Sequence, residues 1–343
     1  MGTTKIMIEK VKSINPKRLN LLASNIAKEN NKTISYVKRD MIKNFIKYGI
    51  GYTDYFKGNY INLTEEEKKN YVTSKNYINV LKYLNPKEYR ILTLNKLVFN
   101  KVFKDFLKRD FIDIRTVTEE ELKNFLKNKE YIFAKPITDF GGHGIKRIKV
   151  KDIKDIKRFK KALLSKKQYL LEEALKQHKI LNEINPDCVA SFRIITLYHK
   201  GKVYTFDNVL RVGLDKDPAL ACFDGDMRIN EDGTPASDMW DDNGKKYDKH
   251  PLTGYEIKKL KKVPYVPEAI EMVKEAAKLL PELRYIGWDV AITEKGPAII
   301  EGNETPSYGP TQNYMLNPNT KGHLKEIRDI IGEEEFKNIK LNK

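Results

Sequence analysis

Three oxygen-bearing side chains late in the chain are the residues best suited to chemistry. Asp289 lies in an alternating apolar run, and Glu301 and Asn303 end a second run that follows a turn at 294–297. Successive side chains of a strand point to opposite faces, so Glu301 and Asn303 share one face of the second strand. Asp289 lies across the predicted hairpin. Three converging oxygen ligands are typical of a site that holds Mg²⁺ with substrate phosphates. The alternative is a hairpin whose polar end reaches solvent.

A glycine-rich loop is the second candidate feature. The loop at 137–144 joins two predicted strands and contains Gly141, Gly142 and Gly144, which let the backbone approach phosphate oxygens. It is not a Walker loop, because no Gly-Lys-Ser/Thr follows, nor a dinucleotide fingerprint, because a strand follows it. Lys135 ends the preceding strand and can pair with a phosphate. This pattern predicts a phosphate-binding flap, with a simple turn as the alternative.

Glu172 ends a predicted strand at the junction between two parts of the chain. A strand that ends at an interdomain crevice offers backbone N–H and C=O groups to an adenine ring. The alternative is an ordinary pair of solvated glutamates, Glu172 and Glu173.

Two arginines form a further candidate group. Ser191 and Arg193 share a strand face by parity, and Arg211 lies on the next predicted strand, within reach of Arg193. Two guanidinium groups on one face suit a carboxylate or phosphoryl group, which Arg binds through two parallel hydrogen bonds. Ion pairing with nearby acids is the alternative.

The elements that must position these residues change along the chain. Residues 1–88 are predicted to be helical and polar, with apolar residues at helical spacing from 15 to 51 and a capping signal at Thr64. From about residue 93 helices and strands alternate, and the chain from 189 to 303 is rich in predicted strands. The elements expected are helices from 95, from Thr118, over 151–165 and from Pro267, strands at 131–136, 145–150 and 168–172, a hairpin of 189–198 with 203–212, and a polar loop stretch at 215–253.

The charge of the chain indicates an anionic partner. The formal net charge is +17 over 343 residues, which suits a nucleotide or an acidic glycan. Lys outnumbers Arg several-fold and is spread along the sequence, unlike a base-reading surface, so no specific nucleic acid is expected.

The composition also predicts a cytoplasmic protein. The sequence contains no run of about 18 apolar residues, so no membrane span is expected, and its start lacks the apolar core of a secretory signal. Cys188 and Cys222 are the only cysteines and are expected to be core residues or inert thiols, with no disulfide framework.

In their order along the chain, these features resemble the ATP-grasp superfamily of ATP-dependent carboxylate–amine ligases. The similarity runs from about residue 85 to 312 and is strongest to the sugar-transfer-associated branch related to α-L-glutamate ligases. The motifs that carry it are Phe133-Ala-Lys135-Pro, Ser191-Phe-Arg193, His250-Pro-Leu-Thr-Gly254 and Gly287-Trp-Asp289 with Gly296-Pro and Glu301-Gly-Asn303.

The resemblance implies an α+β fold in which two α+β subdomains grip ATP between them, preceded by the N-terminal helical region. The expected boundaries are an N-terminal helical region at 1–88, a small lobe with its lead-in helix and flap at 89–175, a large strand-rich lobe with the metal site at 176–330, and a tail at 331–343.

The resemblance also implies a role for each matching residue. Asp289, Glu301 and Asn303 would hold Mg²⁺ ions that bridge the ATP phosphates. Arg193 would hold an acyl phosphate or the γ-phosphate, with Lys135 and Arg211 as the other catalytic residues. Asn95 stands where the family has an acid, which leaves Lys96 and Lys101 as alternatives for an earlier ATP-binding lysine. The remaining expected ATP contacts are Lys135, Gly141, Gly142, Gly144, Glu172, Ala174, Leu175 and, at the ribose, Glu183.

The implied activity is ATP- and Mg²⁺-dependent formation of an amide between a carboxylate and an amine through an acylphosphate. One substrate is expected to be an amino acid, or a cell-surface glycan or its precursor, which would link the protein to polysaccharide biosynthesis. The alternatives are a phosphotransferase or thioester-forming enzyme on the same scaffold, and a non-catalytic binder of anionic polymer. The joint presence of Asp289, Glu301 and Asn303 argues against the binder.

Overall fold

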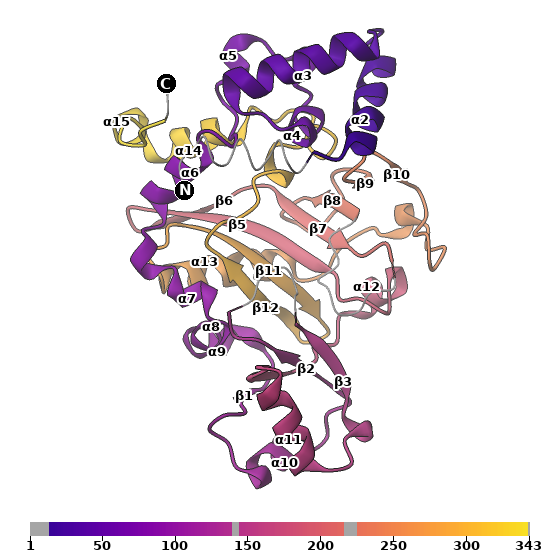
Figure 1. Cartoon of the computed structure of the whole chain (residues 1–343), viewed down its shortest axis with the longest axis vertical. Coiled ribbons are helices and arrows are strands. Elements are labelled where there is room, and N and C mark those ends of the chain that lie inside the picture. Colours follow the sequence, from indigo (N-terminus) through magenta and orange to yellow (C-terminus); the bar gives the residue numbers. More distant parts are fainter. Residues whose placement is uncertain (1–13, 139–143, 216–224, 342–343) are drawn as a thin grey trace.

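Two antiparallel sheets organise the computed structural model, which describes residues 14–138, 144–215 and 225–341. A four-stranded sheet with the order β1-β4-β2-β3 forms a small lobe at one end of the molecule (Figure 1). An eight-stranded sheet with the order β10-β9-β8-β7-β5-β11-β12 forms the large lobe, and β6 pairs with β5 off this path. The fold is therefore mixed α+β, as predicted.

The small lobe packs two helices on one face of its sheet. Ile132, Ala134 and Leu171 of the strands form a buried cluster with Leu122 and Leu163 of the helices. The predicted helix start at Thr118 is confirmed, because the side chains of Thr118 and Glu121 cap each other's backbone N–H. The elements are β1 (Phe111–Asp113), α10 (Glu119–Leu126), β2 (Tyr131–Lys135), β3 (Lys146–Lys149), α11 (Ile156–Ser165) and β4 (Leu170–Glu173).

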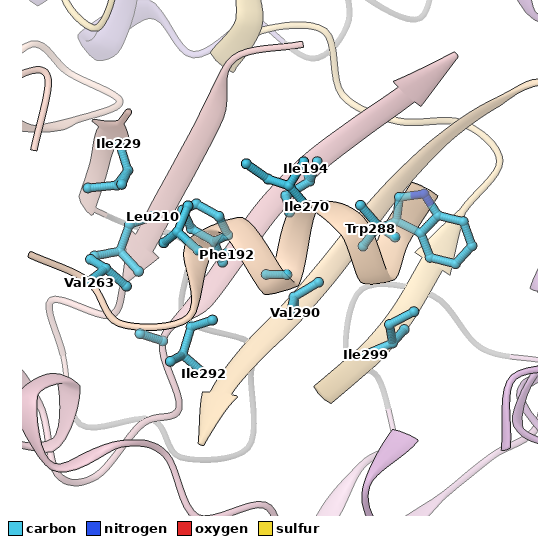
Figure 2. Packing of buried hydrophobic residues seen from close by; sticks show 14 of the residues in the cluster. Phe192, Ile194, Leu210, Ile229, Val263, Ile270, Trp288, Val290, Ile292 and Ile299 are labelled. Atoms are coloured by element: carbon cyan, nitrogen blue, oxygen red, sulfur yellow. The ribbon is translucent and has the colours of Figure 1, made fainter. Parts of the chain in front are cut away.

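The large sheet packs one face on α13 (Val266–Lys278), which begins next to Pro267 as predicted (Figure 2). Phe192, Ile194, Leu210 and Val290 point from the strands into this core, where Trp288 is also fully buried. The other elements of the lobe are α12 (Lys179–Ile184), β5 (Ser191–His199), β6 (Lys202–Thr205), β7 (Asn208–Val212), β8 (Gly225–Ile229), β9 (Met239–Asp241), β10 (Lys246–Tyr247), β11 (Tyr285–Thr293) and β12 (Gly296–Asn303).

Helices from both ends of the chain cover part of the opposite face of the large sheet (Figure 1). Ile195 and Leu197 of β5 pack there against Val80, Leu84 and Leu324. The helices concerned are α6 (Tyr77–Leu84), α14 (His323–Ile331) and α15 (Glu333–Phe336); farther out lie α2 (Pro16–Glu29), α3 (Ile34–Tyr48), α4 (Tyr52–Lys57) and α5 (Glu65–Lys68), which have their own core cluster around Leu22, Tyr55 and Tyr60.

Three short helices lead from the N-terminal region to the small lobe and contact β12 on the way. These are α7 (Ile91–Leu94), α8 (Lys96–Val102) and α9 (Lys104–Leu107). Single 3₁₀ turns complete the fold: η1 (Tyr60–Asn62), η2 (Lys87–Tyr89), η3 (Val150–Asp152), η4 (Ile257–Lys259) and η5 (Pro310–Gln312). None of the helices within the described ranges is long and apolar enough to cross a bilayer.

The structure corrects several expected elements. The helical pattern from 15 to 51 is broken at Asn31, whose φ of 51° cannot continue a helix, and strand β1 was not predicted. The predicted second hairpin run is two strands, β6 and β7, and the expected loop stretch from 215 to 253 contributes β8, β9 and β10 to the sheet. The domain boundaries at 88, 175 and 330 stay predictions.

Cys188 is buried, as expected of a core residue, but it is disulfide-bonded, so the expected absence of disulfides is wrong for this cysteine. Cys222 lies outside the described residues.

Candidate active site

The strand pair β11 and β12 brings Asp289, Glu301 and Asn303 together through a β-bulge. Pairing runs regularly from the turn to Val290 opposite Ile299, and then Asp289 pairs with Glu301, so that Ile300 is an extra residue. Ile299 therefore faces the apolar core, while Glu301, two residues on, faces the opposite side of the sheet. In a regular strand these two side chains would share a face. The bulge thus places Glu301 beside Asp289.

Asp289 is held by an arginine and a serine of the adjacent strand. Arg193 lies opposite Asp289 and donates to both carboxylate oxygens, with Nε–Oδ1 and Nη2–Oδ2 distances of 2.7 Å each. The Ser191 hydroxyl donates to Oδ1 at 2.8 Å. Burial alone would raise the pKa of Asp289, but the guanidinium and its hydrogen bonds lower the pKa below its ordinary value. Asp289 is therefore a buried carboxylate that stays ionised.

Glu301 has the opposite electrostatic setting. Its Oε1 accepts from the Asn303 amide at 3.2 Å, and the same amide nitrogen lies 3.4 Å from Oδ2 of Asp289. Burial and the neighbouring charge of Asp289 raise the pKa of Glu301, despite the opposing effects of Asn303, Lys135 and Arg193. Two carboxylates thus lie side by side in one site, and Arg193 pairs directly with Asp289.

Two adjacent carboxylates fit a hard divalent cation. Two carboxylates and an amide oxygen are the oxygen donors that Mg²⁺ prefers, and a bound cation would remove the repulsion between Asp289 and Glu301. No cluster of three His, Cys, Asp or Glu side chains that could hold a metal occurs in the described part of the chain. A metal here would take its third ligand from the Asn303 amide. The predicted metal ligands are thus adjacent, and their metal-binding role stays a prediction.

Arg211, the second arginine of the predicted pair, is held by an acid of a neighbouring strand. It lies opposite Ser191 on β5 and opposite Asp226 on β8, and its Nε is 3.4 Å from Oδ1 of Asp226. Burial raises the pKa of Asp226, although the charge of Arg211 opposes this. The alternative of ion pairing with nearby acids therefore describes both arginines, and each still faces the polar side of the sheet.

A second buried charge network joins the two lobes. Glu172 is 3% exposed and forms an ion pair through Oε2 with the ammonium of Lys135. Its Oε1 accepts from Asn100 Nδ2 at 2.6 Å and from Arg109 Nη2 at 3.0 Å. Burial opposes ionisation, but the charges of Arg109 and Lys135 hold the pKa of Glu172 far below its ordinary value. Glu172 is therefore not the solvated residue of the alternative prediction.

Sequence reasoning missed Arg109 and Asn100. Arg109 stands in a Lys-Arg-Asp run that is typical of a solvated surface, and its partners are distant in sequence. The residue type of Arg109 could have indicated its buried ion pair, because Arg is scarce in this chain and most of its basic residues are Lys. Arg109, Arg193 and Arg211 all form partly or fully buried ion pairs.

The other predicted ATP contacts are distributed between the lobes. The backbone N–H of Lys96 donates to Ile137 O at 2.9 Å, so Lys96 lies beside the start of the glycine loop. Lys101 is exposed on α8 and lies near Asp113 of β1. Which of the two lysines would bind ATP stays a prediction.

Directly after β4, the Ala174 N–H donates to Tyr131 O at 3.2 Å, so this donor is not free for an adenine ring. Leu175 is partly buried, and Glu183 is exposed on α12. Gly144 accepts at its carbonyl from Gln168 Nε2 at 2.7 Å. Gly141 and Gly142 lie outside the described residues.

A cavity of about 720 Å³ lies away from these residues. Met227, Ser237, Tyr247 and Lys258 are among the side chains that line it, and no candidate residue in the described ranges does. The candidate site therefore consists of the charged groups on the polar sheet face and lies outside this cavity.

The chain belongs to the sugar-transfer associated ATP-grasp family, whose model matches residues 73–328. The predicted family, its branch and the ATP-grasp fold are thereby confirmed. No sequence among curated proteins matches the chain.

Solved structures of similar fold have low sequence identity. The ATP-grasp ligase PsnB, complexed with minimal precursor, Mg and ADP, is 14% identical at a TM-score of 0.41 over 74% of this chain and 62% of PsnB. D-alanyl-alanine synthetase A from Vibrio cholerae O1 biovar eltor str. N16961 is 13% identical at a TM-score of 0.42 over 73% and 67%. The ADP complex of the N5-carboxyaminoimidazole ribonucleotide synthetase PurK is 10% identical at a TM-score of 0.38 over 63% and 46%. The chain thus spans about three fifths of PsnB.

Proposed function

We propose that this protein is an ATP- and Mg²⁺-dependent ligase that joins a carboxylate to an amine through an acylphosphate. The observation that carries the proposal is the pairing of Asp289 with Glu301 beside Asn303, on the sheet face that also presents Arg193 and Arg211. Membership of an ATP-grasp family supports the same chemistry.

Phosphoryl transfer from ATP to a carboxylate requires positioning and charge neutralisation by the protein more than a nucleophilic side chain. A carboxylate is a poor electrophile, so its oxygen attacks the γ-phosphorus of ATP to give an acylphosphate and ADP, and an amine then displaces phosphate. Mg²⁺ held by Asp289, Glu301 and Asn303 would neutralise phosphate charge and orient it for transfer. The role of these three side chains as Mg²⁺ ligands is part of the proposal.

The residues of the chain itself would do the remaining work. Arg193 has five N–H donors and uses two N–H···O contacts on Asp289, so its other N–H groups can bind an acyl phosphate. Lys135 would bind phosphate oxygens. Glu172, which also pairs with Arg109, would keep the ammonium group of Lys135 oriented. Lys96, beside the glycine loop, would add a further positive charge.

The substrates are proposed from charge and family. A carboxylate-bearing amino acid, or a cell-surface glycan or its precursor, suits the net charge of +17 and the two arginines of the polar face. We place this reaction in polysaccharide biosynthesis and in the cytoplasm, where ATP is supplied.

Hydroxylamine trapping tests the reaction class. Purified protein with Mg·ATP, hydroxylamine and a panel of amino acids, dicarboxylates and uronic acids is expected to yield ADP and a hydroxamate for particular acids, because hydroxylamine intercepts an acylphosphate. ADP, AMP and hydroxamate are measured together, and boiled protein is the control.

Each other outcome of this experiment counts against the proposal. ADP formation without hydroxamate would favour phosphotransfer to the substrate, and AMP formation would indicate a different activation chemistry. No nucleotide consumption together with no ATP binding would favour a non-catalytic binder of anionic polymer.

A further inference from the structure

Arg109 connects the small lobe to the β12 bulge that orients Glu301. Its side chain is 3% exposed, at the end of the segment that leads from α9 to β1. Nη1 donates to Ile299 O at 2.6 Å, and Nη2 donates to Ile300 O at 3.0 Å and to Glu172 Oε1 at 3.0 Å. One guanidinium thus binds two consecutive carbonyls of β12 and a carboxylate of β4.

The two carbonyls belong to the residues that define the bulge. Ile299 is the last residue of the regular pairing with β11, and Ile300 is the extra residue. A bulge leaves part of the ladder unpaired, and buried carbonyls need a donor from elsewhere. β12 is the last strand of the sheet, so this donor must come from outside the sheet, and Arg109 supplies it.

The bulge decides which face Glu301 occupies. Continued regular pairing from Val290 opposite Ile299 would place Ile300 opposite Asp289 and Glu301 opposite Trp288, in the apolar core. The extra residue turns Glu301 and Asn303 to the polar face instead. Stabilising the two bulge carbonyls therefore stabilises the placement of two predicted metal ligands.

Guanidinium geometry suits this task better than an ammonium. Arg presents its donors in a rigid planar fork that can serve neighbouring acceptors at once, whereas Lys offers a single compact charge. Glu172 anchors the fork from the small lobe, and Lys135 and Asn100 hold Glu172 in turn.

We propose that Arg109 is a positioning residue that fixes the β12 bulge and so couples the phosphate-binding side of the small lobe to the metal carboxylates of the large lobe. This inference rests on the proposed function, because it concerns the same Mg²⁺ and nucleotide site. The contacts of Arg109 are to the carbonyls of Ile299 and Ile300 and to Glu172, so it would act on the metal through the placement of Glu301 and Asn303.

The test compares Mn²⁺ binding to the ADP-saturated protein, with Mn²⁺ replacing Mg²⁺ and free Mn²⁺ measured by electron paramagnetic resonance. Arg109→Met is expected to weaken Mn²⁺ binding by about tenfold to a hundredfold, the usual effect of removing a group that orients metal ligands. Metal-free ADP binding, measured by calorimetry, is expected to change much less. Arg109→Lys keeps the charge opposite Glu172, guards against loss of the fold, and is expected to restore Mn²⁺ binding in part.

Arg115 provides the matched control. Its exposed side chain pairs with Asp113 in the same lobe, and Arg115→Met is expected to leave Mn²⁺ binding unchanged. Mn²⁺ affinity that is equal in wild type and both Arg109 variants overturns the inference, as does an equal loss in Arg115→Met. Failure of the wild type to bind Mn²⁺ with ADP would instead count against the proposed function.

Discussion

Replacing Glu301 with glutamine is expected to lower ATP-dependent turnover by about a hundredfold or more, because the variant loses one of two carboxylates that would hold the metal. The free energy of unfolding is expected to stay the same or to rise. Burial and the charge of Asp289 raise the pKa of Glu301, so the ionised side chain is unfavourable in the metal-free fold. Turnover is measured as ADP release, and stability by denaturant titration.

The pH dependence of the free energy of unfolding provides a second test of Glu301→Gln. A folded-state pKa above the ordinary value of 4.5 means that the folded protein binds more protons than the unfolded chain between these two values. Stability without metal should therefore fall as the pH rises from about 4.5 through the raised pKa. Glu301→Gln should lack this fall.

Glu294→Gln is the control, because Glu294 lies at the exposed turn of the same hairpin and accepts from the Lys179 N–H at 2.8 Å. Near wild-type turnover in Glu301→Gln, or an equal loss in Glu294→Gln, would contradict the metal assignment.

Replacing Arg193 with methionine is expected to destabilise the protein by about 3–5 kcal/mol, because it leaves a buried carboxylate without its countercharge. Asp289 is 1% exposed and takes both of its strongest hydrogen bonds from this guanidinium. The measurement is the free energy of unfolding by urea titration at neutral pH.

A double variant separates the charge effect from lost packing. Arg193→Met with Asp289→Asn removes both charges, so it should recover a substantial part of the stability lost in the single variant. If the single variant is as stable as wild type, or the double variant is as unstable as the single, then Asp289 does not depend on Arg193 as the contacts indicate.

The faces of the strands could be predicted from sequence to a large extent. Alternation predicted that Ser191 shares a strand face with Arg193, and that Glu301 shares one with Asn303, and both relations hold in the structure. The signals at Thr118 and Pro267 also lie next to helix starts, because caps and prolines act within one turn. These features depend on neighbours in sequence.

The partner of Glu301 could not be predicted in this way. Simple counting from the turn at 294–297 places Glu301 opposite Trp288, and one extra residue in β12 changes its partner to Asp289. The bulge depends on Arg109, whose acceptors are Ile299 and Ile300, far along the chain. A contact of this kind has no local signature in the sequence.

The charged partners of the arginines were also hidden by distance in sequence. Arg211 pairs with Asp226, which the sequence placed in a loop stretch but which lies on β8. The β-propensity of short strands such as β8 depends on their packing against neighbours, and this context is absent from a local pattern. The ion pair of Arg211 with Asp226 could therefore be recognised only once the order of the strands in the sheet was known.

In the proposed function, Asp289, Glu301 and Asn303 hold the metal of a bound nucleotide. The most direct measurement is the anomalous diffraction of crystals grown with Mn²⁺ and ADP, in which Mn²⁺ replaces Mg²⁺. We predict an anomalous peak bound to Glu301 together with Asp289 or Asn303, next to the ADP phosphates. ADP bound with its Mn²⁺ elsewhere, or a peak that persists unchanged in Glu301→Gln crystals, would contradict the account.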